Sequence, residues 1–144
     1  MLRLTVTLAL VATSAPAFAD TCNAPLPKDG DRVMGSGDRL TGWVTFIIDG
    51  DSFCVSTTPP ATPHSSFEVW LGDFNAPELG EPGGHGAKDA LSKLTLGQKV
   101  ECWLDDQDKL NRIVAVCTLC HENIGDLLRA QGVRESSRGI ERQW

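Results

Sequence analysis

FIIDGDSFCV, at residues 46–55, is the most informative segment for the fold, because two apolar runs meet there at an Asp-Gly-Asp sequence. The segment WVTFII, residues 43–48, is rich in β-branched and aromatic side chains, which favour β-strands. Asp49-Gly50 is a common hairpin sequence, and SFCV at residues 52–55 resumes the strand pattern. A β-hairpin is therefore predicted here, with its turn at the two aspartates.

Apolar segments farther along the chain predict three more strands. They are FEVWLGDF at residues 67–74, KVECWL at 99–104 and RIVAVCTL at 112–119. The polar segment DDQDKLN joins the last two, so we expect these two strands to form a second hairpin.

Two helices are predicted from apolar residues that recur three and four positions apart. The first stripe consists of Ala87, Ala90, Leu91 and Leu94, and the second of Ile124, Leu127 and Leu128. The order is then three strands, a helix, two strands and a helix. This order favours a five-stranded OB-type barrel with two or three helices, which is a mainly β fold with some α. A flat α+β sheet is the alternative.

The first 19 residues have the plan of a cleaved export signal, with Arg3, an apolar run and Ala17-Phe18-Ala19 at its end. A membrane anchor is the competing interpretation. The run is shorter than the roughly 20 apolar residues of a span, and Thr and Ser interrupt it. We expect the mature protein to be periplasmic or secreted, without a membrane attachment. The expected division is a signal peptide at 1–19, an irregular arm at 20–42 and a barrel domain at 43–144.

The charge of the mature chain is negative. Without the signal it carries 12 Lys and Arg against 19 Asp and Glu, a net charge of −7. Affinity for phosphate backbones comes from basic surface, so this balance disfavours a nucleic-acid partner unless basic residues cluster locally. A protein partner is the other partner class that the composition allows.

Three short motifs follow one another in a specific order. They are DGDS at residues 49–52, APE at 76–78 and DKLNR at 108–112. Taken alone, each is an ordinary turn sequence. Their order and spacing resemble those of the thermonuclease family, the staphylococcal-nuclease-like domains, over about residues 43–133.

The resemblance implies an OB barrel that cleaves DNA or RNA phosphodiesters with a calcium ion. Asp51, Asn75 and Ala76 fall at the positions that would hold the metal. Glu78 falls on the carboxylate that orients or deprotonates the attacking water, and Arg112 on a phosphate-binding arginine. Calcium prefers carboxylate and carbonyl oxygens, and guanidinium groups bind phosphate at two points, so the residue types suit this chemistry.

The sequence departs from the family pattern at the site itself. Trp70 stands where a phosphate-binding arginine is expected, and Asn75 replaces an acidic metal ligand. The chain has no tyrosine, and Leu110 takes the place of one in the last motif. Loss of a charged transition-state donor typically costs two to three orders of magnitude in rate. We therefore expect reduced nuclease activity with weak or lost calcium binding, or else a catalytically inactive OB-fold binding module.

Simpler interpretations of the same residues remain open at this stage. Asp51 and Glu78 would be solvated loop acids. Arg112 would pair with an acid of its own hairpin. Trp70 would be a packed aromatic residue rather than a surface on which a substrate base stacks.

The five cysteines suggest an oxidising compartment. Cys102 and Cys117 lie on the two strands of one predicted hairpin, where exported members of the resembling family commonly carry a bridge. The pairing of Cys22, Cys54 and Cys120 is left open. The string Cys117-Thr118-Leu119-Cys120-His121 also matches the attachment motif of c-type haem, which is a distant alternative function.

Overall fold

The computed structural model describes residues 22–107 and 112–137. The expected signal peptide and Leu110 lie outside these residues. The main strands are β3 (Arg39–Ile47), β4 (Ser52–Ser56), β5 (Phe67–Leu71), β6 (Lys99–Gln107) and β7 (Ile113–Leu119), and the helices are α1 (Gly84–Thr95) and α2 (Ile124–Ala130). Shorter elements are β1 (Lys28–Asp29), β2 (Arg32–Val33), β8 (Glu122–Asn123) and the 3-10 turn η1 (Pro63–Ser65).

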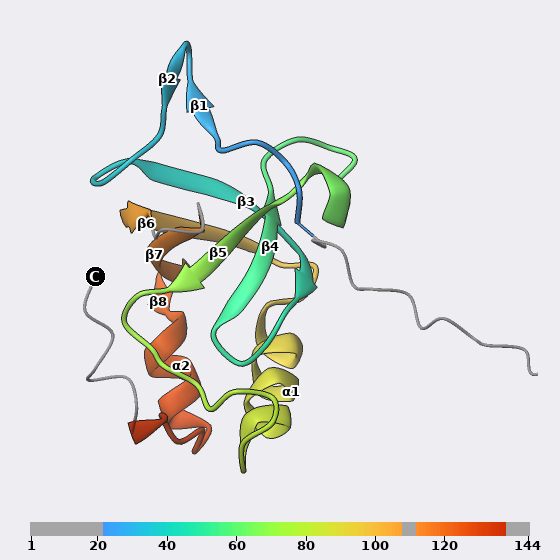
Figure 1. Cartoon of the computed structure of the whole chain (residues 1–144), viewed down its shortest axis with the longest axis vertical. Helices are drawn as coiled ribbons and strands as arrows, with labels where there is room; N and C mark the ends of the chain where they lie inside the picture. Colours follow the sequence, from blue (N-terminus) through green and yellow to red (C-terminus); the bar gives the residue numbers. More distant parts are fainter. Residues whose placement is uncertain (1–21, 108–111, 138–144) are drawn as a thin grey trace, which may run out of the picture.

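The sheet closes into a five-stranded barrel. Its strand order is β5-β4-β3-β6-β7-β8, and β5 also pairs with β7. The β5–β7 pairing is parallel, whereas the others in this sheet are antiparallel. This closure confirms the expected OB-type barrel and excludes the flat sheet. Both helices lie at the same end of the barrel, below it in the view of Figure 1.

Alternation of apolar and polar residues explains the core. In β5, Phe67, Val69 and Leu71 are buried, while Glu68 and Trp70 are half-exposed. The inward side chains of the other strands join this core, together with one face of each helix. Burial of such apolar area is the main force that holds a barrel of this size together.

The strand bounds differ from the expectation at two places. β3 begins at Arg39, four residues earlier than predicted, and the arm before it contains the β1–β2 hairpin. β5 ends at Leu71 rather than at residue 74, because the chain turns at Gly72 and Asp73. The carbonyl of Asp73 accepts a hydrogen bond from Arg129. Beyond Leu71, the chain is held first by β7, where the N–H of Gly72 donates to the carbonyl of Ala115 at 2.9 Å, and then by α2 at Asp73.

Two disulfides join the described residues. Cys102 and Cys117 lie directly opposite each other on β6 and β7, with 4.0 Å between their Cα atoms, which confirms the expected bridge. Cys22 pairs with Cys54 and so ties the arm to β4. Cys120 is left as an exposed free thiol. The bridge at Cys117 leaves no thiol there for haem attachment, so the haem alternative is incompatible with this structure.

Candidate functional site

The two aspartates at the β3–β4 turn have different roles. Asp49 Oδ1 accepts hydrogen bonds from the backbone N–H of Asp51 at 3.1 Å and from Ser52 Oγ at 2.6 Å. A side chain that bonds its own backbone two residues on is a common way to close a turn. Asp49 is thus a structural turn residue, and the side chain of Asp51 points elsewhere.

Asp51 is buried and connects the turn to a distant loop. Its side chain is 5% exposed, and its Oδ2 accepts a hydrogen bond from the backbone N–H of Ala76 at 2.7 Å. Its carbonyl accepts a second bond, from the N–H of Leu71, at 2.9 Å. The interpretation of Asp51 as a solvated loop acid is wrong, because a carboxylate in this position holds the loop that follows β5.

Close packing of small residues brings helix α1 against the same place. A Cβ at Gly50 would lie 2.5 Å from the Cβ of Ala76 and 2.6 Å from that of Ala87 on α1. Real Cβ atoms do not approach so closely, so the turn needs glycine here for packing. The turn, the loop after β5 and the start of α1 therefore meet around Gly50.

Glu78 is exposed, but its backbone is held on both sides. Its N–H donates to Oε2 of Glu81 at 2.9 Å, and its carbonyl accepts from the N–H of Glu81 at 2.8 Å. The carbonyl of Glu78 also lies against Gly84, where any Cβ would overlap it. Because Glu78 follows Ala76 by two residues, the two Cα atoms are within about 7 Å of each other. Chain connectivity therefore keeps the backbone of Glu78 close to Ala76, which contacts Asp51.

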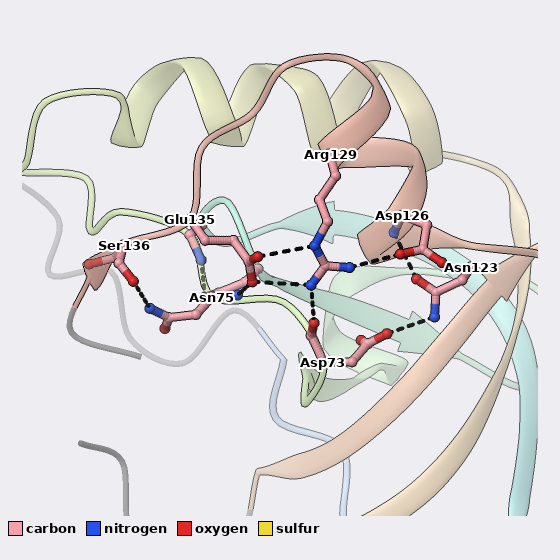
Figure 2. A network of polar contacts seen from close by, with 9 residues as sticks. Asp73, Asn75, Asn123, Asp126, Arg129, Glu135 and Ser136 are labelled. Atoms are coloured by element: carbon pink, nitrogen blue, oxygen red, sulfur yellow. Dashed lines mark hydrogen bonds and ion pairs between the residues drawn. The ribbon is translucent and has the colours of Figure 1, made fainter. Parts of the chain in front are cut away.

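Asn75 faces the C-terminal segment. Its Nδ2 donates to the carbonyl of Ser136 at 3.2 Å, and its backbone N–H donates to Oε1 of Glu135 at 3.1 Å. The N–H of Ser136 returns a bond to the Asn75 carbonyl at 2.8 Å. Figure 2 shows this side chain directed toward Ser136. Oδ1 of Asn75 is buried without a hydrogen-bond partner among the described residues, which leaves one oxygen suited to a cation.

Arg129 on α2 is the centre of the network drawn in Figure 2, and its role was not predicted from the sequence. Its Nε and Nη2 bind the two oxygens of Glu135 at 3.0 and 3.2 Å, and its Nη1 binds Asp126 at 2.9 Å. Its Nη2 also donates to the carbonyl of Asp73. Arg129 lies in α2 and Glu135 lies after the helix ends, so helical periodicity in the sequence does not predict this contact.

The hydrogen bonds of Arg129 lower the pKa of Glu135 below its ordinary value, while partial burial of the carboxyl opposes that effect. The bond from the Asn75 N–H lowers this pKa further. The pKa of Arg129 is raised in turn, first by its hydrogen bonds to Glu135. Glu135 is therefore ionised at neutral pH and accepts bonds from both neighbours.

Trp70 and Arg112 form a second contact, on the outside of the barrel. The guanidinium carbon of Arg112 lies 4.5 Å from the centroid of the Trp70 ring, a cation–π arrangement. Nη1 of Arg112 is 4.0 Å from a carboxylate oxygen of Glu68, and both side chains are 30% exposed. The structure thus brings Arg112 to Trp70 and to Glu68, an acid outside its own hairpin.

The Asp51–Ala76 contact and the Arg112–Trp70 contact both adjoin β5, but they lie at different positions along the strand. Asp51 lies at the level of Leu71, and the β5–β7 register places Arg112 beside Glu68. Three residues of an extended strand span about 10 Å. The long side chain of Arg112 would have to turn along Trp70 to approach the Asp51 contact.

Among residues 22–107 and 112–137, no group of three or more His, Cys, Asp or Glu side chains is arranged to hold a metal. Calcium accepts carbonyl, amide and water oxygens as well as carboxylates. Oxygens near the loop include the carboxylate of Asp51 and two buried atoms without a hydrogen-bond partner among the described residues, Oδ1 of Asn75 and Oδ1 of Asp73. These oxygens match the preference of calcium for carboxylate and carbonyl oxygens.

A pocket of about 420 Å³ lies beside the loop. Pro77, Ala87 and Ala90 contribute to one part of its lining, and Val133 and Arg134 to another. Arg134 brings a cation to this pocket, which is otherwise lined largely by apolar and glycine residues. It adjoins the loop on the side of the helices.

Comparison with known proteins identifies no relative. No protein-family model matches the chain, and no curated protein matches it. In the described part of the chain, no helix has the length and hydropathy needed to cross a membrane.

Proposed function

We propose that the protein is an exported, calcium-dependent phosphodiesterase that resembles the thermonucleases and hydrolyses DNA or RNA at a reduced rate. The observation that supports this most is the 2.7 Å hydrogen bond from the Ala76 N–H to Asp51. It joins two of the three sequence motifs, 25 residues apart, in a buried setting. The two disulfides are consistent with an oxidising compartment outside the cytoplasm.

The proposed roles follow from exposure and charge. Asp51 and Asn75 would hold the calcium ion, which would stabilise negative charge on the phosphate. Glu78 is exposed beside this position, so its carboxylate can orient a water molecule for attack and accept its proton. The guanidinium of Arg112 would move away from Glu68 and bind the phosphate.

The same contacts explain why the rate should be low. Trp70 has one neutral N–H donor and no positive charge to offer a phosphate, and the guanidinium of Arg112 already lies on its ring. Asn75 adds no negative charge to the metal position, and its amide nitrogen is bonded to Ser136. Both effects weaken stabilisation of charge in the transition state.

The test is cleavage of single-stranded DNA and RNA by the mature protein with calcium, and again after addition of a chelator. Glu78→Gln keeps the shape of the side chain and removes the base, so we expect it to lower the rate at least about a hundredfold. Glu122→Gln, an exposed change on β8, is the matched control and should retain the wild-type rate. Cleavage that survives both the chelator and Glu78→Gln would refute the proposal.

A non-catalytic binding module is the second candidate, and one observation favours it. Arg112 is engaged by Trp70 and Glu68, so the phosphate-binding group of the proposed enzyme is already occupied. Binding of an oligonucleotide or of a protein without any cleavage would support this candidate. The double change Trp70→Arg with Asn75→Asp separates the two. A large gain in cleavage is expected if the site is otherwise complete, and no gain is expected from a binding module.

A further inference from the structure

We infer that Arg129 is a positioning residue for loop 73–78, the segment that carries Asn75, Ala76 and Glu78. The inference rests on the proposed function for its catalytic meaning. Its structural content stands on contacts that can be tested separately. Arg129 is not within the three sequence motifs, and it acts on the site through the loop backbone.

The first step is the contact of Arg129 with the beginning of the loop. Its Nη2 donates to the carbonyl of Asp73, and its guanidinium carbon lies 5.3 Å from the centroid of the Phe74 ring. The ring of Phe74 is buried, at 2% exposure. Arg129 therefore covers a core residue and binds the backbone beside it, which fixes where the chain leaves β5.

The second step runs through Glu135. Arg129 holds both oxygens of this carboxylate, and one of them accepts the N–H of Asn75. A carboxylate gripped at two points keeps a defined orientation, which a single contact does not provide. The bonds between Asn75 and Ser136 then continue the attachment, as Figure 2 shows.

Together, these contacts attach loop 73–78 to two different parts of the protein. The barrel holds it at Ala76 through Asp51, and α2 with the C-terminal segment holds it at Asp73 and Asn75 through Arg129 and Glu135. The bond between Ala76 and Asp51 is buried, whereas the bonds that Arg129 and Glu135 make to the loop are exposed and modest alone. A network of several charged contacts has more influence than an isolated surface pair. The position of Glu78, at the end of this loop, depends on both attachments.

A lysine cannot substitute for Arg129 in this geometry. Four groups receive its donors: both oxygens of Glu135, one oxygen of Asp126 and the carbonyl of Asp73. The planar fork of arginine has five N–H donors in fixed directions, whereas an ammonium has three on one atom. Arg129→Lys therefore keeps the positive charge but cannot reach all four acceptors, so this variant separates the effect of hydrogen-bond geometry from that of charge.

The first experiment measures hydrogen exchange of individual backbone amides by NMR, in the absence of substrate. In Arg129→Lys and Arg129→Gln we expect the amides of Asn75 and Ala76 to exchange at least about tenfold faster, because their local opening becomes easier. The amide of Leu71, at the end of β5, should keep its wild-type rate. Arg39→Gln breaks a surface ion pair to Glu101 on the barrel and is the matched control.

Glu135→Gln tests the second step by itself. It should speed exchange at Asn75 and leave the Asp73 contact of Arg129 in place. Unchanged exchange at both Asn75 and Ala76 in the Arg129 variants would overturn the inference. An equal acceleration at Leu71 would also overturn it, because that result indicates general destabilisation and not control of the loop.

The second experiment compares kcat and KM of the same variants for single-stranded DNA. A positioning role predicts a fall in kcat of about tenfold or more in Arg129→Lys with KM nearly unchanged, since a displaced Glu78 affects attack more than binding. If the wild type cleaves nothing, the proposed function fails while the exchange result still decides the inference. If the wild type cleaves and Arg129→Lys has the wild-type kcat, the positioning role fails while the proposed function stands.

Discussion

Replacement of Asp51 by alanine should destabilise the fold and displace the site loop together. The carboxylate is the acceptor of the Ala76 N–H, and both residues are buried, at 5% and 3% exposure. Water cannot readily take over the bond in such a place. Asp51→Asn offers a comparison, because its amide oxygen can still accept from Ala76 while the negative charge is lost.

The magnitude follows from the kind of bond. A hydrogen bond to a charged group contributes about 1.5–3 kcal/mol, and an N–H left buried without a partner costs about 1–3 kcal/mol. These two figures describe the same loss and are not added, so Asp51→Ala should lower the free energy of unfolding by about 1.5–3 kcal/mol. This is a large part of the total stability of a typical domain, about 5–15 kcal/mol. Asp51→Asn should cost about 1 kcal/mol or less, because a neutral acceptor remains.

Urea unfolding, followed by tryptophan fluorescence with and without calcium, measures both effects. We expect Asp51→Asn to unfold nearly as the wild type does without calcium and to lose any stabilisation that calcium gives, since a ligand stabilises only the state that binds it. Asp89→Asn, an exposed change on α1, is the control. A loss below about 0.5 kcal/mol in Asp51→Ala would refute the reasoning, because the bond to Ala76 would then carry no energy.

Two other predictions concern the barrel and its arm. The double change Cys102→Ser with Cys117→Ser should lower the free energy of unfolding by about 3 kcal/mol, as expected for a bridge that closes a loop of 15 residues, and a loss below about 1 kcal/mol in urea unfolding would contradict it. Arg32 lowers the pKa of Asp38 from 3.8 to about 2, so the contribution of this pair is complete above pH 3.8 and is lost as the pH falls toward 2. NMR titration of the Asp38 carboxyl should show the low value in the wild type and a return toward 3.8 in Arg32→Gln, and an unchanged value in the variant would show that Arg32 is not the cause.

Local patterns in the sequence determined most of the architecture. Apolar alternation and helical spacing depend on neighbouring residues, so the five barrel strands and both helices were predicted within a few residues of their bounds. The bridge between Cys102 and Cys117 followed from the expected hairpin and the resemblance, because partners on paired strands lie opposite each other. The early start of β3 was missed, since the Gly- and Asp-rich arm gives no strand signal before residue 39.

Only the tertiary structure decided what the polar residues of the site do. Asp51 accepts a hydrogen bond from a backbone N–H that lies 25 residues away. Every residue except proline has such a donor, so the sequence does not indicate which one Asp51 binds. Arg112 lies on Trp70 because β5 and β7 meet where the barrel closes, a contact between strands distant in the chain. Arg129 reaches Asp73 and Glu135 because α2 packs at the end of the barrel. Residue types can be read along the chain, but hydrogen-bond partners are fixed by the packing of segments that the chain keeps far apart.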